Sequence, residues 1–135
     1  YLADIYFETD LKNQIEKNLD CSGLVPCFKS NNSKYSYLKL EDPNNQESRA
    51  IEVAEKTVIS DNASAGFYYF AKGSDFVEGA ESMIRKERRV NNMFYICPVY
   101  QELVEVGKKV KMISSEFKFG LGSPEELEDF KRSLE

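Results

Sequence analysis

The sequence predicts an α/β fold in which helices flank a mixed β-sheet. Short apolar runs bounded by turn residues alternate with amphipathic helical stretches along the 135 residues. A β-hairpin pattern interrupts this alternation, so the sheet is expected to contain antiparallel as well as parallel pairs. A chain of this length buries about two-thirds of its unfolded surface. Because no stretch resembles a linker, we expect residues 1–135 to form one domain.

The first element is a helix that begins at Thr9 or Asp10, either of which can cap its N-terminus. Turn-forming residues end this helix at 21–23. The apolar run 24–28 then predicts a buried strand, and Pro26, which lacks an N–H, favours an edge position or a β-bulge. The helix carries one apolar stripe at helical spacing, formed by Leu11, Ile15 and Leu19.

A hairpin and an aromatic strand follow. Residues 35–40 alternate in the manner of a strand, a turn is expected at 42–45, and residues 51–54 provide the hairpin partner. Residues 66–70 form the most strand-like run of the chain, because aromatic residues follow the initial glycine without interruption.

The second half of the chain is predicted to be mainly helical. A strongly amphipathic helix begins at Ser74 or Asp75. Another helix has Pro98 as its first residue, where a missing N–H costs nothing, and ends at Gly107. Residues 110–113 then form a short strand. The apolar positions of the amphipathic helix are Phe76, Val77, Ala80, Met83 and Ile84.

The last helix begins with a complete capping box. Ser123 is its N-cap, Pro124 its first residue and Glu126 its third. The loop 120–124 in front of it contains two glycines. This loop either holds an anion at the N-terminus of the helix or forms a plain turn.

Composition excludes several classes of function. The net charge is −5, which argues against nucleic acid as a partner, and no apolar run is long enough to cross a membrane. Histidine is absent, which excludes histidine general bases, catalytic triads and histidine-containing zinc sites. Residues 1–4 show no signal-peptide pattern. The sparse cysteines Cys21, Cys27 and Cys97 indicate reduced, buried thiols and a cytoplasmic location.

Glu55 and Lys56 are candidate binding residues, because they lie where the strand 51–54 gives way to a loop. Adjacent residues of a strand point to opposite sides, so the two side chains would pair poorly with each other and remain available to two groups of a ligand. The alternative is an exposed surface pair. The cluster 85–89 has a basic excess and is predicted to be the solvated end of a helix.

Two further places are open to a ligand or to plain packing. Gly66 follows a run of small residues, which allows a ligand to approach the backbone or a helix to pack closely on a strand. Tyr35 and Ser36 either stack on and hydrogen-bond a sugar or base, or belong to the packing of their strand.

Residues 33–40, 51–56, 62–70 and 120–127 form four stretches that occur in the order found in one known family. Together they resemble the C-terminal part of the sugar-1-phosphate nucleotidyltransferases, the nucleotide-sugar pyrophosphorylases related to glucose-1-phosphate thymidylyltransferase. The resemblance covers nearly the whole chain. It implies the α/β/α fold of the nucleotide-diphospho-sugar transferases, of which this chain is the C-terminal half.

The resemblance also implies a reaction and a role for each candidate residue. In the family a sugar-1-phosphate attacks the α-phosphate of a nucleoside triphosphate, pyrophosphate leaves, and Mg²⁺ holds the phosphates. Carried over, Lys56 contacts the sugar phosphate as the catalytic residue, and Glu55 accepts hydrogen bonds from sugar hydroxyls. Tyr35 and Ser36 lie beside the sugar, and Gly66 lets the backbone approach it.

The chain departs from the family in two ways. The glycine-rich segment that binds the triphosphate is absent, and the family's metal-binding Asp would lie just before Tyr1. At Gly120, many members carry a second metal-ligand Asp. We therefore assign no metal ligand to this chain and expect Mg²⁺ only in a longer enzyme, of which this chain is the second half.

The resulting functional hypothesis is the sugar-phosphate-binding half of a nucleotidyltransferase that makes nucleotide sugars for polysaccharide biosynthesis. The nucleoside triphosphate would bind through the missing half, so this chain alone should catalyse no transfer. Copies of the chain are expected to associate. The alternative is a non-catalytic sugar-phosphate-binding or assembly module that kept the fold.

Overall fold

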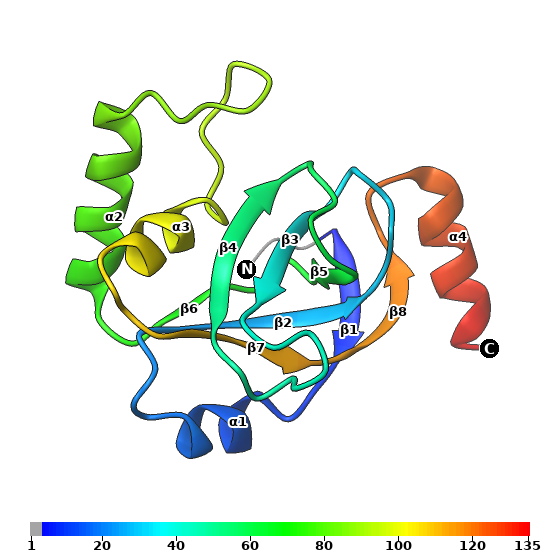
Figure 1. Ribbon diagram of the computed structural model, residues 1–135. Coiled ribbons are helices and arrows are strands. Elements are labelled where there is room, and N and C mark those ends of the chain that lie inside the picture. The colour runs from blue at the N-terminus through cyan, green and yellow to red at the C-terminus, as the bar shows by residue number, and fades with distance from the viewer. Residues whose placement is uncertain (1–3) are drawn as a thin grey trace.

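A computed structural model describes residues 4–135, except for the side chains of residues 117–119. It confirms the α/β class: a curled mixed sheet is flanked by helices, with α2 and α3 on one side and α4 on the opposite side (Figure 1). The elements are β1 (Ile5–Glu8), α1 (Leu11–Lys17), β2 (Gly23–Lys29), β3 (Ser36–Leu40), β4 (Ala50–Glu55), β5 (Asn62–Ser64), β6 (Tyr69–Phe70), α2 (Gly73–Arg85), α3 (Val99–Glu105), β7 (Val110–Ser114), β8 (Glu116–Gly120) and α4 (Pro124–Ser133).

The main sheet has the order β4-β3-β5-β2-β6, and β7 pairs with the other edge of β2. The pair β2–β7 is parallel, whereas β3–β4, β3–β5, β2–β5 and β2–β6 are antiparallel. The predicted hairpin of 35–40 with 51–54 is therefore confirmed as β3–β4.

The prediction that Pro26 places its strand at an edge or a bulge is wrong, because β2 has partners on both sides. On one side β5 pairs with residues 27–29 and β6 with residues 23–24, which leaves a gap beside Pro26. The carbonyl of Pro26 faces this gap and accepts a hydrogen bond from Ala65 N at 2.9 Å. No strand there requires the N–H that proline lacks.

The aromatic run 66–70 is not one strand, and only Tyr69–Phe70 forms β6. Gly66 has a φ of +81°, which turns the chain out of the sheet after β5. The aromatic side chains pack on α3 instead: the ring of Phe70 stacks on that of Tyr100 at 4.4 Å, and Tyr68 lies 6.1 Å from the same ring. Aromatic packing overrides strand propensity here.

A second, two-stranded sheet was not predicted. It consists of β1 and β8, with Ile5 opposite Gly120, and α4 packs against β8 (Figure 1). This pairing brings the start of the described chain next to the loop that leads into α4. The family resemblance predicts a metal-binding Asp just before Tyr1, and that position lies outside the described residues.

The helix ends follow the sequence signals closely. The Asp10 side chain caps α1, Gly107 has a φ of +82° after α3, and Ser123 with Glu126 forms the predicted capping box of α4. Pro98 is the N-cap of α3. Leu19 does not continue the apolar stripe of α1, since it lies beyond the helix and is 77% exposed.

The buried face of α2 differs from the predicted one. Among the apolar positions that the sequence singled out, Met83 is buried but Val77 and Ile84 are about half exposed, at 51% and 49%. The face that meets α3 is centred on Gly79, and a β-carbon there would lie 2.8 Å from Val99 Cγ1 and 3.0 Å from Leu103 Cδ1. A small residue, which the apolar pattern does not reveal, sets the distance between the two helices.

The core lies between the main sheet and α2 with α3. All three cysteines are buried free thiols, as the sequence predicts. None of the described helices is long and apolar enough to cross a membrane.

The contact between α2 and α3 can be tested with two glycines of α2. Gly79→Ala should lower the free energy of unfolding by about 1–3 kcal/mol, because its methyl group collides with α3. Gly73→Ala is the control: no atom lies within 4 Å of its added β-carbon, so the variant should be neutral or more stable by up to about 1 kcal/mol. Urea unfolding measures both, and equal stability of the two variants would contradict the packing.

Candidate functional site

A cavity of about 740 Å³ lies where the ends of several strands meet. Its walls come from the starts of β1 and β3, the ends of β4, β5 and β8, the loop before α3, and the first turn of α4. A cavity of this volume suits a small-molecule ligand. It is lined by residues 4–5, 34–36, 55–56, 94–96 and 122–123, and by Ser64, Gly66, Tyr68, Gly120 and Glu126.

All five residues that the sequence singled out line this cavity: Tyr35, Ser36, Glu55, Lys56 and Gly66. The sheet explains why they meet. The antiparallel register of β3 and β4 places Ser36 directly opposite Glu55, and β5 pairs with β3 one residue further on. Residues separated by up to 31 positions in the sequence thus share one wall, from Tyr35 to Gly66.

The carboxylate of Glu55 is buried in this wall, with 8% of the residue exposed. The Ser36 hydroxyl donates a short hydrogen bond to Glu55 Oε2. A buried carboxylate requires such donors or a nearby cation to offset the loss of hydration. Ser36 is itself buried, so this contact fixes the carboxylate rather than leaving it to water.

Lys56 is held in an unusual backbone conformation, with a φ of +57°. This turn brings its ammonium to 3.8 Å from Glu55 Oε1, so the prediction that the two side chains point apart is wrong. The same ammonium lies 5.2 Å from the centre of the Tyr95 ring. The strand rule of alternating sides fails because Lys56 is no longer in extended conformation.

Behind Glu55, the wall is made of protonated neutral groups. Burial raises the pKa of the Cys97 thiol to about 12, and burial also raises the pKa of Tyr68. Neither group carries a charge at neutral pH, so Cys97 is not a thiolate nucleophile. The Gly66 N–H donates to Ser64 Oγ at 3.1 Å, and the left-handed φ of Gly66 explains why glycine occupies that position.

The opposite wall is built around Glu126. Its Oε2 accepts hydrogen bonds from Gly122 N at 3.1 Å and Ser123 N at 3.0 Å, and its Oε1 lies 3.8 Å from Lys34 Nζ. These N–H groups are already satisfied, which favours the plain-turn reading of the glycine-containing loop over an anion site. Gly120 leaves room for this carboxylate, since a β-carbon there would lie 2.4 Å from Glu126 Oε1.

The described residues hold no preformed cluster of metal ligands. No group of three or more Cys, Asp or Glu side chains within residues 4–135 has a metal-binding arrangement, residues 117–119 aside. Of the carboxylates that line the cavity, Glu126 is occupied by backbone N–H groups and lies near Lys34. Mg²⁺ takes carboxylates free to coordinate, together with water and substrate phosphates. The ion therefore stays a prediction for a longer enzyme.

Sequence reasoning missed several residues of this cavity. Asp4 lines it from the start of β1, although the family's acidic residue was expected before Tyr1. Lys34 appeared only as part of a family-like stretch, and Tyr95 lies on a loop without any pattern. The capping-box signal did locate Glu126, but it gave no indication that its carboxylate reaches the cavity.

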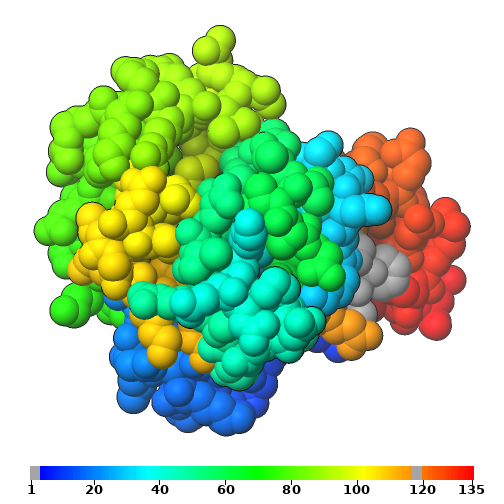
Figure 2. Space-filling model, in the orientation of Figure 1, coloured from blue at the N-terminus to red at the C-terminus, as the bar shows by residue number. Residues whose placement is uncertain are grey.

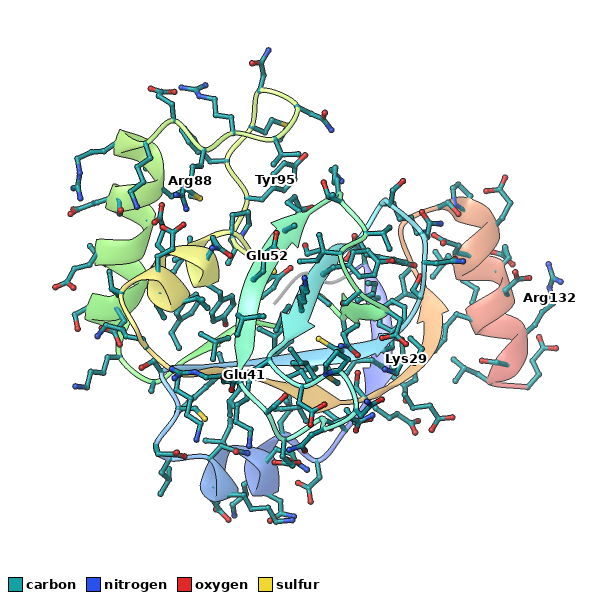
Figure 3. All side chains as sticks on the ribbon, viewed as in Figure 1. Lys29, Glu41, Glu52, Arg88, Tyr95 and Arg132 are labelled. Atoms are coloured by element: carbon teal, nitrogen blue, oxygen red, sulfur yellow. The ribbon has the colours of Figure 1, made fainter. Side chains whose placement is uncertain are left out.

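Ion pairs connect α3 with the start of the loop that carries Tyr95. Lys86 and Arg88 contact Glu102 and Glu105 of α3: Lys86 Nζ lies 2.9 Å from Glu102 Oε2, and Arg88 Nη1 lies 2.9 Å from Glu105 Oε1. Figure 3 shows Arg88 between α2 and α3, with Tyr95 further along the same loop, toward β4. The cluster 85–89 is largely exposed, as predicted, and Arg88 is half-buried; Lys86 and Arg88 in addition form ion pairs with α3.

The fold is similar to that of solved sugar nucleotidyltransferases, and this chain spans about half of their length. One similar solved structure is a nucleoside-diphosphate-sugar pyrophosphorylase from Vibrio cholerae RC9. It has 25% sequence identity and a TM-score of 0.73, and the match covers 94% of this chain and 50% of the pyrophosphorylase chain. No protein-family model matches the sequence, and no curated protein matches it at a significant level.

Two further structures share the fold at lower identity. A Bacillus anthracis protein assigned as a glucose-1-phosphate thymidylyltransferase, in complex with a sucrose, has 18% identity and a TM-score of 0.66 over 96% of this chain and 51% of its own. HddC from Yersinia pseudotuberculosis, complexed with GMP-PN, has 17% identity and a TM-score of 0.53 over 98% and 52%. The resemblance to this class is thereby confirmed, and the half-length coverage is consistent with a C-terminal part.

The ion pairs of the Tyr95 loop predict an acid-sensitive contribution to stability. The hydrogen bond from Arg88, joined by bonds from Lys86 and Gln101, lowers the pKa of Glu105 from 4.5 to about 2. This contribution is fully present above pH 4.5 and is lost as the pH falls toward 2. Because the Glu105 side chain is 35% exposed, screening limits it to about 1 kcal/mol.

Glu105→Gln should therefore lower the free energy of unfolding at pH 7 and flatten its decline between pH 4.5 and 2. Urea unfolding at several pH values measures this, with Glu81→Gln, an exposed position on α2, as the control. A decline as steep in Glu105→Gln as in wild type would contradict the assignment.

Proposed function

We propose that this chain is the sugar-phosphate-binding half of a nucleotidyltransferase that joins a sugar-1-phosphate to a nucleoside triphosphate, releasing pyrophosphate. The observation that carries the proposal is the pairing of a buried carboxylate with an ammonium group, 3.8 Å apart, on one wall of the 740 Å³ cavity. The similarity to sugar nucleotidyltransferases supports the same class of reaction.

Glu55 suits the recognition of sugar hydroxyls. Its Oε2 already accepts from Ser36, and a carboxylate has further lone pairs for hydroxyl donors. Hydrogen bonds to a charged acceptor are stronger than those between neutral groups. Because Ser36 fixes the carboxylate in advance, the ligand does not pay to order it. Tyr35 and Ser36 would lie beside the sugar, and the turn at Gly66 would let the backbone approach it.

Lys56 suits the phosphate end of the same ligand. Two negatively charged substrates repel each other during attack on the α-phosphate, and an ammonium group next to the attacking phosphate lowers that repulsion. The Glu55 carboxylate and the Tyr95 ring restrict where the Lys56 side chain can go. In this arrangement the sugar lies over Glu55 and its phosphate lies toward Lys56.

We assign the remaining parts of the reaction to the part of the solved structures that has no counterpart in this chain. The chain spans about half the length of the solved structures that it matches. The nucleoside triphosphate, its metal ion and the choice of base are assigned to that other half. Association between copies of the chain and a cytoplasmic location are part of the same proposal.

Glu55→Gln tests the role of the carboxylate. Losing the charge-assisted hydrogen bonds should weaken the binding of glucose-1-phosphate by about 1.5–3 kcal/mol, while the isosteric amide keeps the fold. Titration followed by NMR chemical shifts measures affinity, and circular dichroism checks folding. Glu52→Gln, an exposed position on β4, is the control (Figure 3). A correctly folded Glu55→Gln variant that binds like wild type would remove Glu55 from the site and favour the assembly-module alternative.

Lys56→Ala and Lys56→Arg together distinguish the effect of the Lys56 charge on ligand binding from the effect of its backbone conformation. Both side chains bear a β-carbon, so both variants carry the same cost at a φ of +57°. If the phosphate needs a positive charge, the alanine variant should lose about tenfold in affinity for glucose-1-phosphate and the arginine variant much less. The same titration decides this, and an alanine variant equal to wild type would make Lys56 a surface lysine only.

A further inference from the structure

Lys34 provides a second positive charge at the cavity, and its side chain reaches Glu126 on the wall opposite Glu55. Its side chain lines the cavity from the residue before Tyr35, and its ammonium lies 5.0 Å from the centre of the Tyr35 ring. The two lysines are close: Lys56 Nζ donates a hydrogen bond to the backbone carbonyl of Lys34 at 3.4 Å. A phosphate held at Lys56 is therefore within reach of the flexible Lys34 side chain.

The partner of Lys34 in this state is a carboxylate that can be replaced. Lys34 Nζ lies 3.8 Å from Glu126 Oε1, and the two side chains are 53% and 37% exposed. Ion pairs of this length and exposure contribute little, so an incoming anion can compete for the lysine. Glu126 would keep its structural role in the exchange, because the bonds from Gly122 and Ser123 go to the other oxygen, Oε2.

Gly120 makes this arrangement possible. A β-carbon at position 120 would lie 2.4 Å from Glu126 Oε1 and 2.7 Å from Glu126 Cδ, so any other residue would displace the carboxylate. Because Gly120 has no side chain, the Glu126 carboxylate can occupy the space next to Lys34. A carboxylate of the protein occupies the place beside the lysine that a ligand phosphate would take.

We propose that the phosphate of the ligand binds between Lys34 and Lys56 and displaces Glu126 from Lys34, so that Glu126 acts as an internal competitor for the anion. The identity of the sugar rests on the proposed function, but the anion site does not. Before a ligand binds, the charges of the cavity carboxylates and lysines nearly balance. A phosphate can contact both ammonium groups only if it displaces Glu126 from Lys34. The arrangement selects phosphorylated ligands over neutral sugars.

The test is an NMR titration of the chain with inorganic phosphate and with glucose-1-phosphate, in a buffer that contains a metal chelator. Lys34→Gln should weaken both ligands about threefold or more. Glu126→Gln should strengthen both about threefold, because glutamine preserves the capping box but does not compete for the lysine. In the double variant Lys34→Gln/Glu126→Gln, the gain should disappear. Neutral glucose should show neither effect.

Matched controls come from the exposed face of α4. Lys131 and Glu128 form an exposed ion pair at 2.9 Å, and Lys131→Gln and Glu128→Gln change the net charge by the same amounts as the test variants. Both controls should leave phosphate binding unchanged. Circular dichroism checks that every variant is folded.

Three results would overturn the inference: no phosphate-dependent shifts in the wild type, wild-type affinity in Lys34→Gln, or a Glu126→Gln gain that persists without Lys34. The last result would reduce the effect to net charge. Failure of the proposed function gives a different pattern. In that case Glu55→Gln leaves glucose-1-phosphate binding unchanged, while inorganic phosphate still responds to Lys34 and Glu126.

Discussion

The burial of one carboxylate, that of Glu55, is the constraint on which the cavity depends. A carboxylate removed from water is costly unless donors and cations replace the lost hydration. The Ser36 hydroxyl and the Lys56 ammonium do this, and the β3–β4 register determines where both of them lie. A slip of one residue in this hairpin would turn Glu55 to the other face of the sheet and separate it from Ser36.

A second buried carboxylate organises the other side of Lys56. The Glu102 side chain is 3% exposed, and Lys86 and Arg88 from the end of α2 provide its counter-charges. These contacts tie the start of the loop that carries Tyr95 to α3, and Figure 2 shows α2 and this loop packed as one continuous body against α3. Lys56 therefore lies between two elements that are each positioned by a buried acid, which restricts an otherwise flexible side chain.

Local signals predicted the helix caps and the hairpin, because caps and alternation act within a few residues, whereas the candidate site around Glu55 was predicted from the family resemblance. Features decided by distant partners were not predictable. Pro26 is tolerated in a central strand only because β5 and β6 leave a gap beside it. The fate of residues 66–70 depends on the Tyr100 ring, and the ion pair of Glu55 with Lys56 depends on a positive φ that no propensity favours at lysine. The roles of the five site residues stay predictions, although the structure gathers all of them around one cavity.

On the proposed function, the charge balance of the cavity determines what a nucleotide-binding half would have to supply. Among the described lining residues, Asp4, Glu55 and Glu126 carry the negative charges, and Lys34 and Lys56 carry the positive ones. A sugar phosphate can use both lysines, which leaves no cation among the described lining residues for a triphosphate. In-line attack between two anions depends on neutralising the developing charge. On the proposed function, nearly all the positive charge on the triphosphate side would then come from a nucleotide-binding half or from a metal ion held there, and this chain would bind one of the two substrates.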